Sequence, residues 1–406
     1  MGLVRRKAFL FYGVLFAAFT WLASDAQMTT TNPTSQASTT AAPARGLYAG
    51  CDDNVCKRPD CVCARDLPPA GLRNDQMPQF VMLSFDGAVN VVNMKFYREL
   101  LEGARRKNKA NGCGIAATFF VTHEYLDYAA VNELYSWGNE IALHSISHQT
   151  NWDYWHTINS TQWEREVVDQ KVMLQTFANI SGFDITGVRG PFLVSGGDQG
   201  FRKLSQHFRY DSTLVHPRRS DEKPFFPYTM DFGFQLSCNV DPCPNGTYPG
   251  LWLLPVNVLF RQQMPCAVAD ACMPQPTSAK ETFEFLRSNF EEFYTTNRAP
   301  FPVFLQEGYL RDPGRKQGYL QFIDWLLQKD DVYLVTASEV LDFMQDPEPL
   351  GVYNQLVCPG GGAVVNTCPK PTTCSYKRTQ LGSDRYMRIC SRCPRKYPWV
   401  GNPLGN

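Results

Sequence analysis

The sequence has no excess of charge of either sign. Its 406 residues carry 39 Lys plus Arg and 39 Asp plus Glu, so the net charge at pH 7 is zero. A nucleic-acid-binding protein normally carries a basic surplus on at least one face, and this balance argues against that class. Hydrophobic residues form 44% and aromatic residues 13% of the chain, which supplies a large core and excludes wholesale disorder.

Long apolar runs and the common nucleotide-binding motifs are also missing. After residue 26 no uninterrupted apolar run reaches the ~17–25 residues that span a bilayer, so we expect no further membrane span. The chain has no Gly-rich phosphate loop, no dinucleotide fingerprint and no Gly-x-Ser-x-Gly elbow. These absences argue against P-loop, Rossmann and α/β-hydrolase chemistry.

The N-terminus has the pattern of an export signal. Arg5–Lys7 precede an apolar run from Ala8 to about Ala23, and Ser24 and Ala26 have the small-x-small spacing of a cleavage site. This predicts a signal peptide over residues 1–26. The alternative is an uncleaved anchor helix, because the run approaches spanning length. Fourteen cysteines, an even number, agree with export and favour disulfides over zinc.

Composition divides the remainder into four parts. Residues 27–50 are rich in Thr, Ser, Ala and Pro and predict a flexible linker. Residues 51–77 begin with four closely spaced cysteines, and residues 78–347 form the body of the protein. Residues 348–406 hold five cysteines with little periodicity, which indicates a disulfide-stapled tail. Three glycosylation sequons agree with export, at Asn159, Asn179 and Asn245.

Short apolar runs alternate with helical patterns through the body. The predicted strands are Phe80–Phe85, Ile115–Val121, Glu140–His144, Ile185–Val188, Leu251–Val256, Val303–Gln306 and Val332–Val335. The predicted helices are Asn93–Arg106, Thr161–Phe177, Ala279–Tyr294, Tyr319–Gln328 and Ala337–Met344. These strands are too apolar to have a solvent-exposed face, and they alternate with helices. This pattern predicts an α/β fold with a parallel sheet. Periodicity does not distinguish an open sheet from a closed barrel.

Four polar residues next to predicted strands are candidates for chemistry. His144 and His148 are four residues apart, and on a helical turn this spacing puts two imidazoles on one side, as for a metal. Asp86 ends a strand, where α/β enzymes place catalytic groups, and Arg189 could orient a carboxylate. The alternatives are a helix cap or a surface position for each histidine, a cap or turn for Asp86, and a surface position for Arg189.

Six motifs follow one another along the chain after Cys56-Lys-Arg-Pro-Asp-Cys-Val-Cys63. They are Met82-Leu-Ser-Phe-Asp-Gly-Ala-Val-Asn90, Ala117-Thr-Phe-Phe-Val-Thr-His-Glu-Tyr125, Glu140-Ile-Ala-Leu-His-Ser-Ile-Ser-His148, Arg189-Gly-Pro-Phe192, Tyr210-Asp-Ser212 and Pro249-Gly-Leu-Trp252. In this order they resemble the polysaccharide deacetylase (NodB-homology) family, and more closely the invertebrate chitin deacetylases. The resemblance implies a distorted (β/α) barrel of about seven parallel strands, here with disulfide-rich N- and C-terminal extensions.

The resemblance also implies a reaction. Family members remove acetyl groups from N-acetylglucosamine units with a divalent metal, commonly zinc, which acidifies water and polarises the amide. By position, His144 and His148 match the metal histidines and Asp86 matches the general base. Arg189 matches the residue that orients the base, and the Phe192 backbone N–H matches an oxyanion donor. The resemblance further suggests substrate contacts at Tyr210, Asp211 and Trp252.

The chain departs from the family pattern within this site. The family has Thr-Phe-Asp-Asp, in which the second Asp is a metal ligand, whereas this chain has Ser84-Phe-Asp-Gly87. Gln306 stands where a histidine is expected to protonate the leaving amine, and glutamine has no proton to give. Leu253 replaces an expected acidic residue. These departures predict a zinc ion that is weakly held or absent.

The sequence thus predicts a secreted, extracellular-matrix protein whose partner is chitin or another N-acetylglucosamine polymer. The leading hypothesis is a chitin deacetylase-like pseudoenzyme in which N-deacetylation is slow or lost. The alternatives are an active metal-dependent chitin N-deacetylase and a structural barrel without sugar affinity. The tail has a second interpretation as a chitin-binding module, although its five cysteines break the six-cysteine pattern of such modules.

Overall fold

The computed structural model describes residues 50–353, 358 and 365–406. The chain separates into two compact units, Met1–Ala44 and Arg45–Asn406, of which the first lies outside the described residues. The predicted signal peptide and all of the predicted linker except Gly50 also lie outside them. Within the described ranges no helix has the length and apolar character needed to cross a bilayer.

Nine strands form the main sheet of the second unit. They are β1 (Gln79–Asp86), β2 (Thr118–Val121), β3 (Glu140–Leu143), β4 (Gly187–Val188), β5 (Tyr210–Asp211), β7 (Tyr228–Met230), β8 (Tyr248–Leu253), β12 (Phe301–Leu305) and β13 (Val332–Val335). Their order is β12-β1-β2-β3-β4-β5-β8-β7, and β13 also pairs with β1. Only the β7–β8 pair of this sheet is antiparallel. The predicted α/β fold with a mostly parallel sheet is confirmed.

The sheet has more strands than the expected seven or so. Strands as short as β5 and β7 show no alternation in the sequence, which is why they were not predicted. Two further short strands, β6 (Val215–His216) and β9 (Val256–Asn257), pair in parallel beyond the ends of β5 and β8. β9 lies beside β12, so the sheet curls towards closure although β12 and β7 share no ladder among the described residues.

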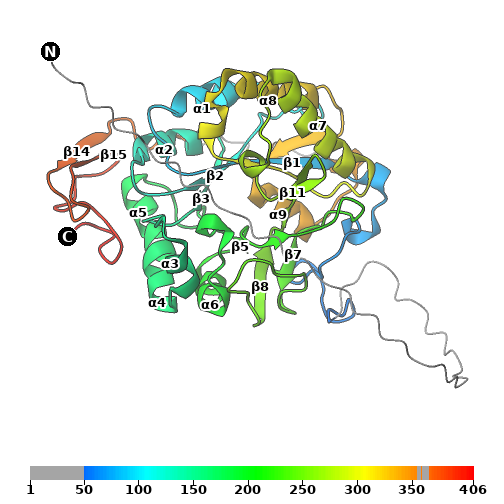
Figure 1. The fold of residues 1–406 in the computed structure, drawn as a ribbon, viewed down its shortest axis with the longest axis horizontal. Helices are drawn as coiled ribbons and strands as arrows, with labels where there is room; N and C mark the ends of the chain where they lie inside the picture. The colour runs from blue at the N-terminus through cyan, green and yellow to red at the C-terminus, as the bar shows by residue number, and fades with distance from the viewer. Residues whose placement is uncertain (1–49, 354–357, 359–364) are drawn as a thin grey trace, which may run out of the picture. The chain divides into compact units, whose positions relative to one another are not determined.

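Most of the helices lie around the outside of the strands (Figure 1). They are α1 (Met94–Leu101), α2 (Tyr128–Ser136), α3 (Trp152–Thr157), α4 (Ser160–Trp163), α5 (Asp169–Phe177), α6 (Gly197–His207), α7 (Ala279–Thr295), α8 (Pro313–Leu326), α9 (Ala337–Gln345) and α10 (Leu350–Tyr353). Side-chain oxygens of Asp127, Ser278 and Thr336 cap α2, α7 and α9. A π-helical turn over Glu164–Val168 separates α4 from α5, where the sequence predicted one helix.

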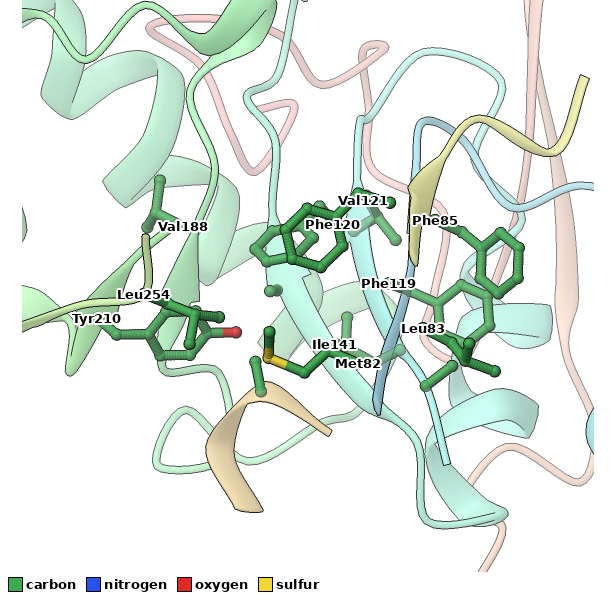
Figure 2. Packing of buried hydrophobic residues seen from close by; sticks show 14 of the residues in the cluster. Met82, Leu83, Phe85, Phe119, Phe120, Val121, Ile141, Val188, Tyr210 and Leu254 are labelled. Atoms are coloured by element: carbon green, nitrogen blue, oxygen red, sulfur yellow. The ribbon is translucent and has the colours of Figure 1, made fainter. Parts of the chain in front are cut away.

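Both faces of the central strands are packed with apolar side chains. Figure 2 shows Phe85 and Phe119 on one side of the strands and Phe120 on the other, as the alternation of strand side chains requires. Phe85 and Phe119 stack with ring centroids 5.4 Å apart, and Phe120 meets Tyr210 edge-on at 6.5 Å. Burial on two faces explains why these strands read as continuous apolar runs.

All fourteen cysteines form disulfides, as predicted. The pairs are Cys51–Cys63, Cys56–Cys61, Cys113–Cys358, Cys238–Cys243, Cys266–Cys272, Cys368–Cys390 and Cys374–Cys393. Residues 78–347 hold five cysteines, an odd number, so one of them must pair outside this part of the chain. Cys113 does so by pairing with Cys358. Two antiparallel hairpins lie outside the main sheet, β10 (Leu259–Arg261) with β11 (Met264–Cys266), and β14 (Thr372–Tyr376) with β15 (Arg385–Ile389) in the tail. Disulfides join the two sides of the second hairpin.

Candidate functional site

A pocket of about 260 Å³ lies at the carboxyl ends of β1, β2, β3 and β12. Parallel strands bring the residues that follow them to one edge, which is where α/β proteins build their sites. The lining residues are Asp86, Gly87, Thr122, Glu124, Tyr125, His144, Ser147, His148 and Gln306. The structure therefore brings together the predicted base, both predicted metal histidines and both degenerate positions.

Arg189 holds Asp86 from beneath the pocket. Its side chain is fully buried, and Nη1 donates to Asp86 Oδ1 at 2.7 Å and to Ser84 Oγ at 2.8 Å. The guanidinium is sandwiched between the rings of Phe120 and Phe304, at 4.0 and 4.1 Å from their centroids. A buried cation fixed on all sides holds one carboxylate oxygen and leaves the other free to accept a proton. Arg189 is thus not a surface residue.

The two histidines meet in a turn. Their ring centroids are 4.9 Å apart, but the helical turn suggested by their spacing is wrong. Ser145 and His148 adopt left-handed φ values of 76° and 41°, and Ser145 Oγ accepts the His148 N–H at 3.1 Å. Buried Glu166 fastens the same turn by accepting from Ser147 N and Oγ at 2.9 and 2.6 Å. Side-chain hydrogen bonds therefore replace the helical ones.

Both imidazoles have the protonation state of a metal ligand. His144 Nδ1 lies 2.7 Å from the Arg189 carbonyl oxygen, which only accepts, so Nδ1 carries the proton and Nε2 a lone pair. Burial lowers the pKa of His144. Burial and the neighbouring His144 lower the pKa of His148 to about 4. At neutral pH both rings are uncharged and able to bind a cation.

Gly87 leaves this pair without a third protein ligand. Its φ is +114°, and a Cβ placed on it would meet nothing within 4 Å, so the pocket is open where a side chain would stand. Within the described residues, no His, Cys, Asp or Glu joins both imidazoles in a group whose ligand atoms all lie within 4.8 Å. A catalytic zinc centre takes three protein ligands. The residues present do not fit a tightly held ion, and we assign no chemical step to one.

Gln306 lies in the pocket, and the partly buried Asp270 carboxyl accepts from its backbone. The Gln306 N–H donates to Asp270 Oδ2 at 3.1 Å, and burial raises the pKa of Asp270. The next residue, Glu307, does not line the pocket and pairs with Arg311 at 3.5 Å. Asp270 was missed from the sequence because it lies in the Cys266–Cys272 loop, where no periodicity marks its position.

The remaining predicted residues lie around the pocket or inside the sheet. Phe192 is 45% exposed with φ +56°, and its ring lies 5.1 Å from that of His148. Tyr210, Asp211 and Trp252 are buried in β5 and β8 and do not line the pocket. Asp211 instead accepts from Thr213 N and Oγ1 at 2.9 and 2.6 Å. In this structure the three buried side chains offer no surface to a sugar and act as supports.

Comparison with known proteins identifies the family. The chain is 39% identical over 367 residues to chitin deacetylase 8 of Bombyx mori, covering 88% of this chain and 94% of that protein. It is 33% identical over 377 residues to chitin deacetylase 1 of Bombyx mori, covering 88% and 68%. The chain belongs to the chitin deacetylase family. No family model matches it.

Solved structures of lower identity also match this deacetylase-family chain. A peptidoglycan N-acetylglucosamine deacetylase catalytic domain from Eubacterium rectale is 14% identical with a TM-score of 0.35, covering 67% of this chain and 96% of that one. An allantoinase is 13% identical with a TM-score of 0.43, covering 69% and 95%. Deacetylases of this family are generally metal-dependent, and Gly87 of this chain offers no ligand atom to the pocket.

The tail of this chitin deacetylase relative contacts two residues that line the pocket, Glu124 and Tyr125. Arg385 of β15 pairs with Glu124, which lines the pocket, and its Nε donates to Glu124 Oε1 at 3.0 Å. The same guanidinium lies 5.2 Å from the ring centroid of Tyr125. Tyr125 is 64% exposed at the pocket edge and has a strained φ of +64°. No pattern in the sequence predicted that the tail contacts residues lining the pocket.

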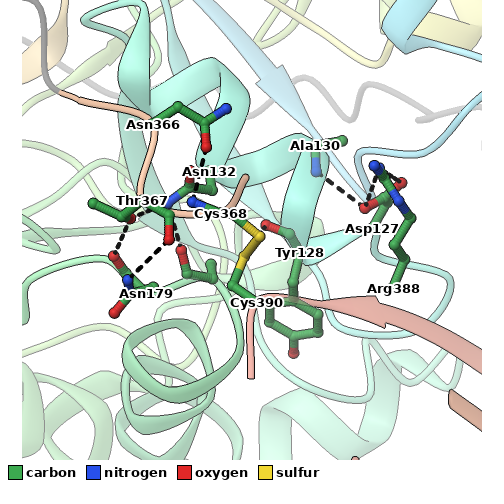
Figure 3. Close-up of a disulfide and its surroundings, with 11 residues drawn as sticks. Asp127, Tyr128, Ala130, Asn132, Asn179, Asn366, Thr367, Cys368, Arg388 and Cys390 are labelled. Atoms are coloured by element: carbon green, nitrogen blue, oxygen red, sulfur yellow. Dashed lines mark hydrogen bonds and ion pairs between the residues drawn. A yellow bond between two sulfur atoms is a disulfide. The ribbon is translucent and has the colours of Figure 1, made fainter. Parts of the chain in front are cut away.

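Further contacts dock the tail against α2 and the loop before it. Figure 3 shows Arg388 paired with Asp127 and the Cys368–Cys390 disulfide beside Tyr128. His123 lies behind the pocket wall and donates from Nε2 to the Pro398 carbonyl at 3.0 Å. Its Nδ1 accepts from the Tyr128 hydroxyl at 2.8 Å. A neutral ring satisfies both partners.

Acidification is expected to weaken this docking through His123. Burial lowers its pKa to about 3, whereas the unfolded chain binds the proton near pH 6.5. The unfolded state therefore takes up more protons as the pH falls from about 6.5 towards 3, and stability is lost in that window. Between pH 7 and pH 5 the loss from this one group is roughly 2 kcal/mol at most.

Urea unfolding of the native protein and of His123→Gln at pH 7 and pH 5 measures this loss. Glutamine still donates to the Pro398 carbonyl but does not titrate, so its stability should fall less on acidification. Burial raises the pKa of Asp211 to about 6, which acts in the opposite direction but equally in both proteins. Equal losses in the two proteins would contradict the assignment to His123.

Proposed function

We propose that the pocket binds N-acetylglucosamine units of chitin and that hydrolysis of the acetamide there is slow or absent. The observation that carries the proposal is the combination of Gly87 and Gln306 in one pocket with Asp86, His144 and His148. The base and the imidazoles are in place, but neither replaced residue supplies a ligand or a proton. The family relationship supports the substrate class.

The remaining groups support recognition better than turnover. Neutral His144 can accept a hydrogen bond at Nε2, because its one ring proton is donated from Nδ1 to the Arg189 carbonyl. Asp86 accepts hydrogen bonds from sugar hydroxyl or amide groups through the oxygen that Arg189 leaves free. Exposed Tyr125 offers an aromatic face at the edge of the pocket, where sugar rings stack. Together they form a polar cleft with one aromatic rim.

A second function, slow metal-assisted N-deacetylation, is favoured by the Asp86–Arg189 pair. Burying an ion pair has a desolvation cost, so its presence beside the pocket favours a functional role. Orienting a general base is such a role. Asp270 accepts from the Gln306 N–H and has a pKa that burial raises, so it is one candidate source of the proton. Its proton would reach the pocket only if Gln306 moved aside.

One experiment separates the two functions. We expect the purified protein, treated with a chelator, to be retained on chitin and to release acetate from chitin oligomers no faster than His144→Ala, with or without added zinc. His156→Ala is the matched control, because His156 lies on α3 outside the pocket. Acetate release that His144→Ala abolishes and His156→Ala keeps would establish the active alternative. Failure to bind chitin would overturn the sugar-binding proposal.

We also infer export to the extracellular matrix. Seven disulfides close all fourteen cysteines, and such density is typical of proteins that fold in an oxidising compartment. The predicted signal peptide and sequons support the same location. The inference predicts that protein from the medium of an expressing cell culture lacks residues 1–26.

A further inference from the structure

The tail carries a charge imbalance that the neutral whole chain conceals. Residues 365–406 contain eight Lys or Arg and one Asp, for a net charge of +7, whereas the rest of the chain has a net charge of −7. Such an asymmetry between parts of a chain indicates a surface for a charged partner. The argument from whole-chain charge against a basic face therefore does not hold for this segment.

Four of these cations surround one cavity. It has a volume of about 390 Å³ and is lined by Ser375, Tyr376, Lys377, Arg378, Thr379, Gln380, Arg395, Lys396 and Tyr397. The Cys374–Cys393 disulfide joins the two segments that form its walls. Gln380 Nε2 donates to the Tyr397 carbonyl at 3.1 Å, and the Tyr376 hydroxyl donates to the Pro394 carbonyl at 3.2 Å. The walls are thus held together by covalent and hydrogen bonds.

The cations of the cavity differ from those that dock the tail. Arg385 and Arg388 form ion pairs with Glu124 and Asp127 of the barrel. Arg378, Arg395 and Lys396 are exposed and form no ion pair with any described residue, and only Lys377 has a partner, Asp384 at 2.8 Å. Like charges gathered without counter-charges repel one another, and an anion would relieve that repulsion.

We propose that this cavity binds the anionic groups of an acidic polysaccharide. Chitin is neutral and its deacetylated product is cationic, so neither attracts these side chains. Guanidinium groups match sulfate and carboxylate oxygens in pairs, and the exposed Ser375 hydroxyl is suited to sugar hydroxyls. A membrane-binding face would combine cations with exposed apolar side chains, which this lining lacks.

The proposal is independent of the proposed function of the barrel pocket and gives the protein a second polymer partner. It is tested by fluorescence anisotropy with a labelled heparin octasaccharide, which carries sulfate, and a labelled octagalacturonate, which carries only carboxylate. The full chain is compared with Arg395→Ala/Lys396→Ala, from the cavity, and with Lys370→Ala/Arg392→Ala. The second pair removes the same charge from exposed positions of the same tail, outside the cavity.

We expect the cavity pair to weaken binding of at least one octasaccharide roughly tenfold and the control pair to leave it within about threefold. Tighter binding of the heparin octasaccharide would identify sulfate as the preferred anion, and tighter binding of the octagalacturonate would identify carboxylate. Equal weakening by both pairs would show attraction by net charge alone and overturn the site. Binding to phosphatidylserine vesicles but to neither octasaccharide would overturn the polysaccharide in favour of a membrane. Unchanged melting temperatures of both variants confirm that they fold.

Discussion

Replacing Arg189 with methionine is expected to lower the free energy of unfolding by about 3–5 kcal/mol. The change leaves Asp86 largely buried without its ion-pair partner and removes the donors to Ser84 and to the Ser212 carbonyl. Methionine keeps most of the apolar contact between the Phe120 and Phe304 rings, so the loss reports the charge rather than a cavity. Urea unfolding followed by circular dichroism measures it.

The double variant Arg189→Met/Asp86→Asn is the matched control. Removing both charges avoids an unpaired carboxylate, so the double variant should be more stable than Arg189→Met alone. A double-mutant cycle then gives the coupling energy of the pair. A cost below about 1 kcal/mol for Arg189→Met would place this ion pair among the weak, solvent-screened ones and contradict its burial.

Substituting Gly87 with aspartate is expected to raise zinc affinity at least about tenfold, because a carboxylate ligand contributes more than the second-shell partners worth ~10–100-fold. The open space around a Cβ at this position allows the side chain to fit. The backbone opposes it, since φ +114° is unfavourable for any residue with a side chain. Zinc titration by isothermal calorimetry and metal content by mass spectrometry measure the outcome.

The variant Gly87→Ala separates the two effects of Gly87→Asp, the added carboxylate ligand and the backbone strain. It carries the same backbone cost but no oxygen, so any gain of zinc affinity over Gly87→Ala belongs to the carboxylate. Restored acetate release together with zinc would show that the pocket is otherwise competent. Equal zinc affinity in the two variants would mean that residue 87 does not point at the imidazoles and would remove the basis for the missing-ligand interpretation.

Much of the sheet could be predicted because its strands are long enough to be recognised. β13 appears in the sequence as an unbroken apolar run and was predicted with its observed ends, and the apolar run of β1 is interrupted only by Ser84. α2 was not predicted, because most of its residues are buried and apolar all round, which removes the 3.6-residue contrast. α6 has Gly197 and Gly200 in its first turn and was not predicted, because glycine disfavours a helix.

The site was predictable where chemistry coincides with a strand end. Asp86 ends β1 and His144 follows β3, so parallel strands alone bring them to one edge. Glu124 and Tyr125 lie in the motif Ala117–Tyr125. The hydrogen bond from Arg385 to Glu124, however, joins positions 261 residues apart, which no local pattern encodes. The turn that positions His148 depends on Glu166, which lies in the π-helical turn and accepts from Ser147. This is a tertiary contact that no local pattern encodes.

The Cys113–Cys358 bond has a consequence for the lifetime of the molecule among proteases. It joins two cysteines 245 positions apart and closes a ring that includes the strands β2 to β13. A single peptide-bond cleavage anywhere inside this ring opens it without separating the two fragments. A nicked molecule therefore migrates as one species until it is reduced, and its cleft keeps every group that the intact chain contributes.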